Sequence, residues 1–285
     1  MAVPLLPSGT DEVVCLRPGG PLAGRLVDCA GYRERLATTV LRREIPSSVV
    51  VVVLAFGDPV EVLRSPMEGS GTTLTSLVAG LHDRPAVTGI GGSQHGVQIW
   101  LSPLEAYSIF GVPMHEISNA FLDLEALLGR TGSLLVERLA EAPSWPLRFE
   151  ALGTALAGLI SSGPQADPAV EWAWRRLRAT SGVIRIGALA EQLGWSRRHL
   201  VRRFHEQIGL PPKTVGRILR FERALALLED RGRAFSDVAS DAGYSDQAHL
   251  SREFRALVQC SPGEFAASLR PASPGRRAMS HFFKL

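Results

Sequence analysis

The feature of the sequence that most constrains its fold is a pattern of residues that occurs twice near the C-terminus, about fifty residues apart. Each copy contains an alanine, a glycine, an aromatic residue, a leucine and a phenylalanine in the same order and at nearly the same spacing. These residues are Ala190, Gly194, Trp195, Leu200 and Phe204 in the first copy and Ala239, Gly243, Tyr244, Leu250 and Phe254 in the second. The repetition predicts two copies of one small helical unit.

Each copy predicts two helices joined by a tight turn. In the first copy, Ala190 is small enough for a second helix to cross closely, and Gly194 can adopt the left-handed backbone conformation that ends a helix. Ser196 can then cap the next helix. A small core between the helices would be formed by Leu189, Leu193, Leu200 and Phe204. The turn of the second copy is one residue longer, and a continuous helix predicted over Thr214–Leu228 would hold the two units at a fixed separation.

Charge is distributed unevenly between the two halves of the chain. Residues 1–168 hold 11 lysines and arginines against 17 aspartates and glutamates, a net charge of −6. Residues 169–270 hold 17 against 11, a net charge of +6, and Arg276, Arg277 and Lys284 add positive charge after them. An acidic half joined to a basic half that contains both helical units predicts that the C-terminal part binds a polyanion.

The C-terminal part closely resembles the DNA-binding domain of the AraC/XylS family of transcription regulators. The resemblance covers residues 169–270 and is strongest in the second copy, at Ala239, Gly243, Tyr244, Ser245, Asp246, Arg252, Phe254, Pro262 and Phe265. It implies a sequence-specific DNA-binding domain of seven helices, the first over Ala169–Thr180. Its two recognition helices would enter successive segments of the major groove on one face of the duplex. Residues 163–168 are expected to form a linker, and residues 271–285 a basic tail.

If the leucine and phenylalanine of each copy face the core, the opposite side of the second helix faces solvent. In the first copy this side holds Arg198, Val201, Arg202 and His205, with Arg197 and Arg203 on its flanks. In the second copy it holds Gln247, Ala248, Ser251 and Arg252. Arginine suits guanine, glutamine suits adenine, and valine can pack on a thymine methyl group. These ten residues, at positions that the family also uses, are the predicted DNA-binding residues; the alternative is that they are ordinary solvated helix residues.

The two predicted DNA-reading surfaces differ in charge. Arg198 and Arg202 make the first strongly basic, whereas the second lies beside the acidic residues Asp246 and Glu253. The first copy is therefore expected to contribute more of the affinity, and the second to tolerate more variation in the DNA. His249 lies beside the core leucine of the second copy and is expected to have a structural role.

Residues 1–101 are rich in glycine, proline and β-branched residues, which is typical of short strands separated by turns. Strands are expected over Glu12–Arg17, Arg25–Cys29, Tyr32–Leu41, Ser48–Phe56, Val60–Arg64, Thr72–Leu81, Ala86–Ile90 and Val97–Leu101. They predict a cupin-like antiparallel β-barrel or sandwich. Helices are expected from Pro103 to about Gly111 and over Ser133–Ala142 and Pro146–Ile160. The prediction for the chain is thus an α+β protein, with a strand-rich N-terminal domain over residues 1–162 and flanking helices, followed by an all-α C-terminal domain.

The resemblance implies that the N-terminal domain binds a small effector, dimerises, or does both. His82, His95 and His115 are isolated and lack the His-x-His spacing of a metal-binding cupin, so structural or surface roles are expected for them and no metal or cofactor is predicted. An aromatic group, Trp100, Tyr107 and Phe110, would line a pocket or, more commonly, form core. The candidate partners are double-stranded operator or promoter DNA, a small effector, RNA polymerase and a second copy of the chain.

Two other functions fit parts of the sequence. A regulator of the same type could be controlled by a protein partner or by its own abundance, without a small ligand. A DNA-repair alkyltransferase could carry the same module, but it needs an activated cysteine, and Cys15, Cys29 and Cys260 are dispersed. No catalytic motif is found, so no enzymatic activity is predicted. The longest apolar run, Val49–Phe56, is too short to cross a membrane, and a cytoplasmic location is expected.

Overall fold

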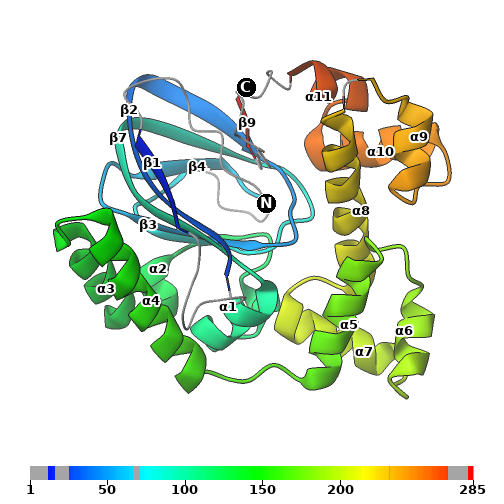
Figure 1. Cartoon of the computed structure of the whole chain (residues 1–285), viewed down its shortest axis with the longest axis horizontal. Helices are drawn as coiled ribbons and strands as arrows, with labels where there is room; N and C mark the ends of the chain where they lie inside the picture. The colour runs from blue at the N-terminus through cyan, green and yellow to red at the C-terminus, as the bar shows by residue number, and fades with distance from the viewer. Residues whose placement is uncertain (1–11, 17–25, 67–70, 231, 269–281, 285) are drawn as a thin grey trace.

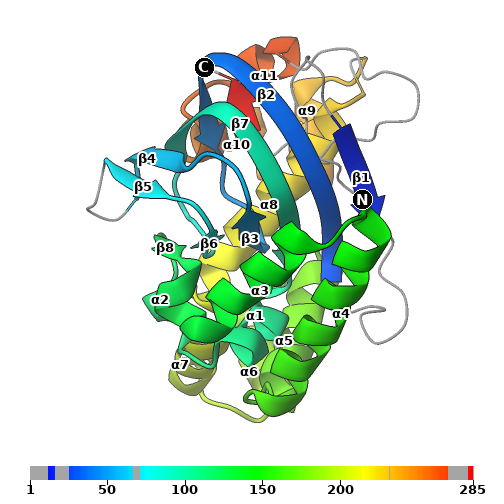
Figure 2. The ribbon, with the colours of Figure 1, turned by 90° about the vertical axis from the view of Figure 1, so that its left-hand side faces the viewer.

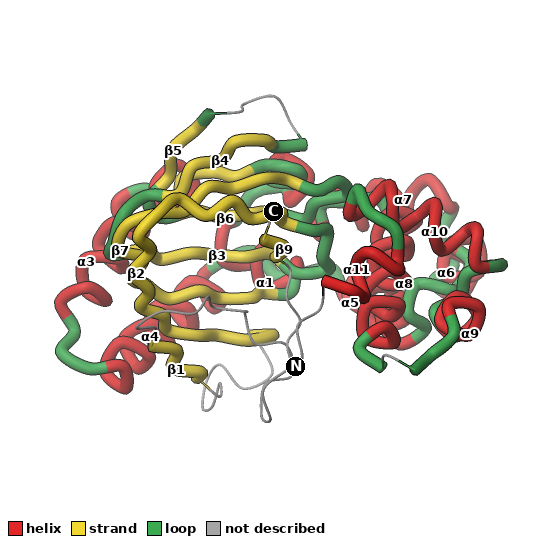
Figure 3. Tube along the Cα trace, turned by 90° about the horizontal axis from the view of Figure 1, so that it is seen from above, coloured by secondary structure: helices red, strands yellow, loops and turns green. Residues whose placement is uncertain are grey.

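The structure is a computed structural model that describes residues 12–16, 26–66, 71–230, 232–268 and 282–284. A curved antiparallel sheet and a set of helices beneath it form the N-terminal part, and the C-terminal helices lie beside them (Figure 1). Seen from above, the strands and the C-terminal helices occupy neighbouring regions of one molecule (Figure 3). In these described residues no helix is both long and apolar enough to cross a membrane.

The sheet is antiparallel at every strand pair that the structure describes, in the order β1-β2-β7-β3-β6-β8, with β4 between β5 and β7 and β9 beside β2. The strands are β1 (Glu12–Leu16), β2 (Leu26–Glu44), β3 (Val50–Ala55), β4 (Val60–Arg64), β5 (Thr72–Leu74), β6 (Leu77–Ala79), β7 (Ala86–Leu101), β8 (Phe121–Asp123) and β9 (Phe282–Lys284). This agrees with the antiparallel N-terminal sheet expected from the sequence. Of the predicted basic tail, residues 271–281 and 285 lie outside the described residues, and β9 lies within it.

Two long strands replace four of the short strands that the sequence predicts. The expected strand Tyr32–Leu41 and residues 26–29 of the expected strand Arg25–Cys29 are parts of β2, and Arg25 lies outside the described residues. Ala86–Ile90 and Val97–Leu101 are parts of β7. The two strands run side by side as long arcs (Figure 2). Gly92 has a φ of 64°, and the pairing of β2 with β7 shifts register opposite it, between Leu36 and Val40. The break that the sequence predicts between the strands Ala86–Ile90 and Val97–Leu101 is therefore an irregularity that bends one continuous strand.

The other differences in the N-terminal part concern short elements. The strand expected over Thr72–Leu81 is divided into β5 and β6, and the short strand β8 was not predicted. Helix α1 (Pro103–Phe110) is as expected, because Ser102 caps it and Gly111 ends it with a φ of 67°. The remaining elements are the 3-10 helix η2 (Met114–Glu116) and the helices α2 (Leu124–Leu128), α3 (Arg130–Glu141) and α4 (Trp145–Ser162).

The C-terminal part holds seven helices in the residues that the structure describes, as the family resemblance implies. They are α5 (Pro168–Ala179), α6 (Ile186–Gln192), α7 (Arg197–Ile208), α8 (Pro212–Leu228), α9 (Phe235–Asp241), α10 (Gln247–Val258) and α11 (Pro262–Ser268). Between α4 and α5, Pro164 accepts a hydrogen bond from Ser108 of α1, and the Asp167 amide donates one to Gln207 of α7. The segment predicted as a linker is thus attached to both parts of the molecule.

The hydrophobic core does not stop at this segment. One cluster of buried residues runs from the sheet through α1 and α4 to α5, α7 and α8, and includes Val97, Leu152 and Phe204. A second cluster surrounds Phe254 and takes in Ile45, which follows β2. Burial of apolar surface is the main stabilising contribution in folding, so the N-terminal and C-terminal parts stabilise one another through both clusters.

Candidate functional site

The first helix-turn-helix unit, α6 and α7, has the local geometry that its sequence predicts. Gly194 ends α6 with a φ of 66°, and the hydroxyl of Ser196 accepts a hydrogen bond from the His199 amide at 3.2 Å. Leu200 and Phe204 are fully buried. Capping and burial together fix the face that α7 turns toward solvent.

The second unit, α9 and α10, repeats this arrangement with different residues. Gly243 has a φ of 80°, and Asp246 replaces serine as the cap, accepting a hydrogen bond from the His249 amide at 2.6 Å. His249 stands edge-on to Tyr244, with ring centroids 5.2 Å apart, as His199 stands to Trp195 in the first unit. The cap follows the glycine by three residues here and by two in the first unit, which is the longer turn expected from the sequence.

Most of the predicted DNA-binding residues lie on the exposed faces of α7 and α10. The exposed side chains are Arg197, Arg198, Arg202, Gln247, Ala248 and Arg252, and those of Val201 and Ser251 are half-buried. Among the residues that the structure describes, no carboxylate forms an ion pair with the three exposed arginines of α7. Their guanidinium groups are therefore accessible to an anionic partner.

Arg203 and His205 take part in contacts within the molecule instead. Arg203 forms ion pairs with Asp167 at 3.3 Å and with Glu206 at 2.8 Å. The ring of His205 stacks on that of His115 in η2, with centroids 4.9 Å apart. Contact of these two residues with DNA remains a prediction, and it would require these internal contacts to open.

Two arginines of α8 that the sequence did not single out support the second unit. Arg217 forms a two-pronged ion pair with Glu253 of α10, at 2.8 and 3.3 Å. Arg220 donates to the Gly182 carbonyl at 2.8 Å, and its guanidinium group lies over the ring of Tyr244. The negative charge of Glu253 beside the second reading surface is therefore paired. Arg217 and Arg220 lie three residues apart in α8, so they share one side of the helix, and this spacing was a usable signal. From the sequence, α8 was predicted only as an apolar helix that separates the two units.

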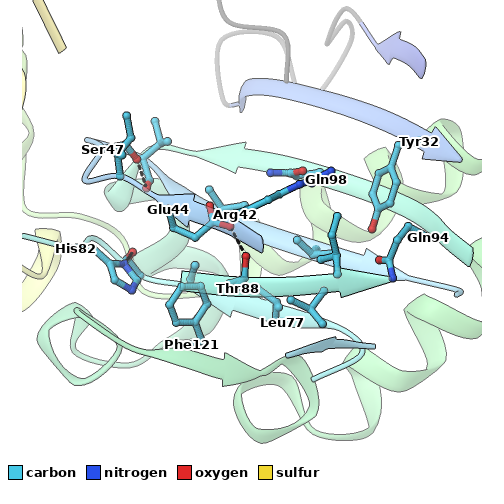
Figure 4. Close-up of a pocket in the computed structure, with 18 of the residues that line it drawn as sticks. Tyr32, Arg42, Glu44, Ser47, Leu77, His82, Thr88, Gln94, Gln98 and Phe121 are labelled. Carbon is cyan, nitrogen blue, oxygen red and sulfur yellow. Dashed lines mark hydrogen bonds between the residues drawn. The ribbon is translucent and has the colours of Figure 1, made fainter. Parts of the chain in front are cut away.

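A pocket lies on the inner face of the curved sheet, with a cavity volume of about 110 Å³ (Figure 4). Inward-facing positions of β2 and β7 carry polar residues where core residues would be expected, and these are Tyr32, Glu34, Arg42, Glu44, Thr88, Gln94 and Gln98. The remaining wall is largely apolar and includes Val51, Val53, Leu77 and Phe121. A concave site with an apolar wall and a few converging polar groups is typical of small-molecule binding.

The polar groups of the pocket interact with one another. Arg42 and Glu34 form an ion pair at 3.2 Å, and the Thr88 hydroxyl donates to Glu44 at 2.6 Å. Burial raises the pKa of Glu44 to about 7, although the Thr88 hydrogen bond and the nearby Arg42 act to lower it. Burial lowers the pKa of His82 to about 4, so this imidazole is neutral at physiological pH.

Replacing Glu44 by glutamine should stabilise the protein at high pH and not at low pH. The folded protein keeps the proton of Glu44 up to about pH 7, whereas the unfolded chain releases it near its ordinary pKa, so the free energy of unfolding falls as pH rises between these values. Glutamine removes this dependence, and we expect Glu44→Gln to be more stable by about 3 kcal/mol at pH 8 and nearly equal to wild type at pH 4.5. Urea unfolding at the two pH values measures the difference; an equal difference at both would contradict the assignment.

The histidines and aromatic residues considered from the sequence are dispersed. His82 lines the pocket, whereas His95 lies edge-on to Phe56 and Trp145, outside it. Trp100, Tyr107 and Phe110 do not line the pocket: Phe110 and Trp100 are buried, and Tyr107 packs against the main core. Among the described residues, no three histidine, cysteine, aspartate or glutamate side chains gather as a metal site would require. The pocket's polar residues were not predicted, although their alternation along two strands was a usable signal.

The cysteine positions bear on alkyl transfer. Cys29 is buried, and burial raises the pKa of its thiol to about 12. Burial also raises the pKa of Cys260. A nucleophilic cysteine needs a lowered pKa, so these two side chains are in the wrong environment for that chemistry.

The segment from Arg43 to Val49 joins the pocket to the second unit. Ser48 donates two hydrogen bonds to the Glu222 carboxylate of α8, from its amide at 2.7 Å and from its hydroxyl at 2.8 Å. Arg43 donates to the Val258 carbonyl at the end of α10, and Ile45 is only 5% exposed in the core of the second unit. Glu44, Ile45, Ser47 and Val49 of the same segment line the pocket. We call residues 43–49 the coupling segment.

Comparison with known proteins locates the C-terminal part in a family. The family model described as a helix-turn-helix domain matches residues 189–268. The uncharacterised HTH-type transcriptional regulator YbfI of Bacillus subtilis (strain 168) is 37% identical over 67 residues, which are 24% of this chain and 24% of YbfI. The HTH-type transcriptional activator RhaS of Escherichia coli (strain SE11) is 37% identical over 75 residues, 26% of this chain and 27% of RhaS. The C-terminal domain is of the AraC/XylS family. The matched region spans about a quarter of the length of these curated relatives.

The fold of the whole chain also has a counterpart among solved structures. ToxT from Vibrio cholerae aligns with a TM-score of 0.50 and 12% identity, over 85% of this chain and 98% of ToxT. At this identity the likeness concerns the fold alone. It supports the arrangement of an N-terminal sheet domain followed by a helical domain with two helix-turn-helix units.

Proposed function

We propose that this protein is a sequence-specific DNA-binding transcription regulator, with α7 and α10 as its recognition helices. The observation that carries the proposal is the pair of helix-turn-helix units joined by α8, each with an exposed polar face. A helix fits the major groove, where every base pair presents a distinct pattern of donors and acceptors. Two units in one chain can read two successive segments of one duplex.

The chemistry of the residues on α7 and α10 supports a proposed role for each face. Arg198 and Arg202 would donate to guanine, Val201 would pack on a thymine methyl group, and Arg197 would contact phosphate. On α10, Gln247 would pair with adenine and Arg252 with guanine or phosphate. Because α7 is the more basic helix, the first unit would contribute more of the affinity.

Selection of bound sequences from a pool of random duplexes tests the proposed function. We expect an enriched site with two elements whose centres are about 10 base pairs apart, one helical turn of DNA. Substitutions in the element read by α7 should weaken binding more than those in the other, and affinity should fall steeply with salt because phosphate contacts release counterions. Recovery of no enriched sequence would contradict the proposal.

We further infer that a small effector bound in the pocket controls this DNA binding. The coupling segment supports the inference, because one side of it lines the pocket and the other holds α8 and α10. A ligand that moves Ile45 or Ser48 would change the packing and hydrogen bonds that position the second unit. The proposed regulator requires no catalysis and acts in the cytoplasm, and RNA polymerase and a second copy of the chain are proposed as further partners.

Substitution of Glu222 by alanine should release the coupling segment. It removes the two carboxylate oxygens that accept hydrogen bonds from Ser48. A hydrogen bond to a charged group contributes about 1.5–3 kcal/mol to stability. We expect the Ser48 amide to exchange its hydrogen roughly 10 to 100 times faster. Hydrogen exchange measured on the full chain tests this, with Glu229→Ala, which changes an exposed residue at the end of α8, as the control. Equal protection of Ser48 in both variants would show that Glu222 does not hold the segment.

A further inference from the structure

We propose that the pocket of the N-terminal sheet binds a small amine, with a protonated amino group at the end formed by Ser47, Glu44, His82 and Thr88 and a short apolar chain along the sheet. We call these four residues the acceptor end. The proposal rests on the proposed function only in taking this pocket as the effector site. In Figure 4 Ser47, Glu44 and His82 lie toward one side of the pocket, Thr88 lies nearer its middle beside Glu44, and Tyr32 and Gln94 lie toward the other side.

The donors at the acceptor end are already used within the protein. The Thr88 hydroxyl donates to Glu44 at 2.6 Å, and the Ser47 hydroxyl donates to the Val49 carbonyl at 3.3 Å. The Nδ1 atom of His82 lies 2.6 Å from the Gly80 carbonyl, which has no proton, so Nδ1 carries the proton of the neutral ring. The Nε2 atom of His82 is then an acceptor, and it is buried without a hydrogen-bond partner among the described residues.

The groups left for a ligand at this end are therefore acceptors. They are the second oxygen of Glu44, Nε2 of His82 and the lone pairs of the two hydroxyl groups. An ammonium group has three donors and no acceptor, and it matches such a set. A carboxylate ligand has only acceptors and would find no partner here while Glu44 is ionised.

The charges of the pocket favour the same ligand. Glu34 and Arg42 neutralise one another, His82 is neutral, and burial raises the pKa of Tyr32, which keeps its phenol neutral. Glu44 is the remaining ionisable group of the pocket lining, so its ionised form leaves a net charge of −1. A cationic ligand would balance this charge. An anionic ligand would be repelled by the Glu44 carboxylate, and the repulsion would be strong because the dielectric constant of a buried site is low.

The apolar wall sets the size and nature of the rest of the ligand. Val51, Ala79 and Phe121 pair in one row across β3, β6 and β8, and Val53 and Leu77 pair in the next. With a cavity volume of about 110 Å³, the pocket has room for a chain of roughly four to six carbon atoms, since a cavity of about 150 Å³ accepts benzene. Gln98, whose amide nitrogen has no hydrogen-bond partner among the described residues, is a neutral donor beside this chain.

Calorimetry with three probes of equal chain length tests the proposal. The probes are butylamine, 1-butanol and butanoate, titrated into the full chain at pH 8, where Glu44 is ionised and butylamine is protonated. We expect butylamine to bind at least tenfold more tightly than 1-butanol and butanoate not to bind. Glu44→Gln should abolish the preference for the amine, whereas Glu61→Gln, which changes an exposed glutamate of β4, should keep it.

Proton release gives a second readout that does not depend on comparing ligands. A bound ammonium group lowers the pKa of Glu44, so binding near pH 7 should release about half a proton. The released proton is taken up by the buffer, and the measured heat of binding should therefore depend on the buffer's ionisation enthalpy. Tighter binding of butanol or butanoate than of butylamine, or binding of butylamine without proton release, would overturn the proposal. If none of the probes binds while the protein still selects a DNA sequence, the amine assignment fails and the regulator function stands; loss of both would remove the regulator function as well.

Discussion

Replacing Arg198 and Arg202 together by alanine is expected to lower the affinity for the selected DNA by roughly 100-fold or more. Each arginine that donates two hydrogen bonds to guanine is worth about 1–3 kcal/mol of discrimination, and every 1.4 kcal/mol is about tenfold in affinity. Both side chains are exposed on α7, so the free energy of unfolding should change by less than about 0.5 kcal/mol. Titration of labelled DNA at fixed salt measures the loss.

A matched control separates base recognition from net charge. Arg130→Ala combined with Arg138→Ala removes two exposed arginines from α3, in the N-terminal part, and changes the net charge by the same amount. This variant should bind the selected DNA nearly as well as wild type does. If the two double variants lost the same affinity, or if the α7 variant lost none, α7 would not be the helix that reads the bases. The single Arg202→Ala variant should cost about 1–3 kcal/mol and relax specificity at one base pair.

Phe204→Ala is expected to give the largest loss of stability among single substitutions in the first unit. The Phe204 side chain is fully buried, in the core cluster that connects the sheet to α5, α7 and α8. Truncation of a buried phenylalanine leaves a cavity and costs about 3–5 kcal/mol. Urea unfolding of the full chain should show this loss in the midpoint.

Phe204→Leu fills most of the same space and should cost much less, which distinguishes a packing effect from a change of fold. DNA binding should fall for Phe204→Ala because the first unit unfolds. It should therefore recover at low temperature or in stabilising solutes. The variant that lacks Arg198 and Arg202 should not recover under these conditions, because it is folded and lacks the contacts with DNA. A midpoint for Phe204→Ala equal to that of wild type would mean that the first unit unfolds independently of the rest.

Contacts that α7 and α8 make with the N-terminal part support the proposed control of DNA binding at two points. The ring of His115 stacks on that of His205 in the first unit. Ser48 donates hydrogen bonds to Glu222 of α8, the helix that leads to the second unit. Both contacts join residues that belong to different parts of the chain. Because the recognition helices are spaced by α8, a change at either point alters how the two exposed faces are presented to one duplex.

The helix-turn-helix units were predictable because the interactions that define them are local. A cap bonds to an amide three residues later, as Ser196 does to His199, and a glycine ends the helix just before it. The positions of Leu200 and Phe204 follow from the period of one helix. Periodicity over a few residues was therefore enough to place the exposed arginines of α7. The same locality explains the correct prediction of α1, which Ser102 caps and Gly111 ends.

The pocket and the coupling segment had no such local signature, and the tertiary structure alone decided them. Glu44 and Thr88 meet because β2 and β7 pair as continuous curved strands, and these two residues are 44 positions apart in the sequence. His82 comes from the segment between β6 and β7 and lines the same pocket. The hydrogen bonds of Ser48 reach a residue 174 positions away. The repeated pattern near the C-terminus thus determined by itself that two helical units form and which face each exposes. Long-range strand pairing and packing, which carry no short-range pattern, decided how those units are held and which ligand chemistry lies beside them.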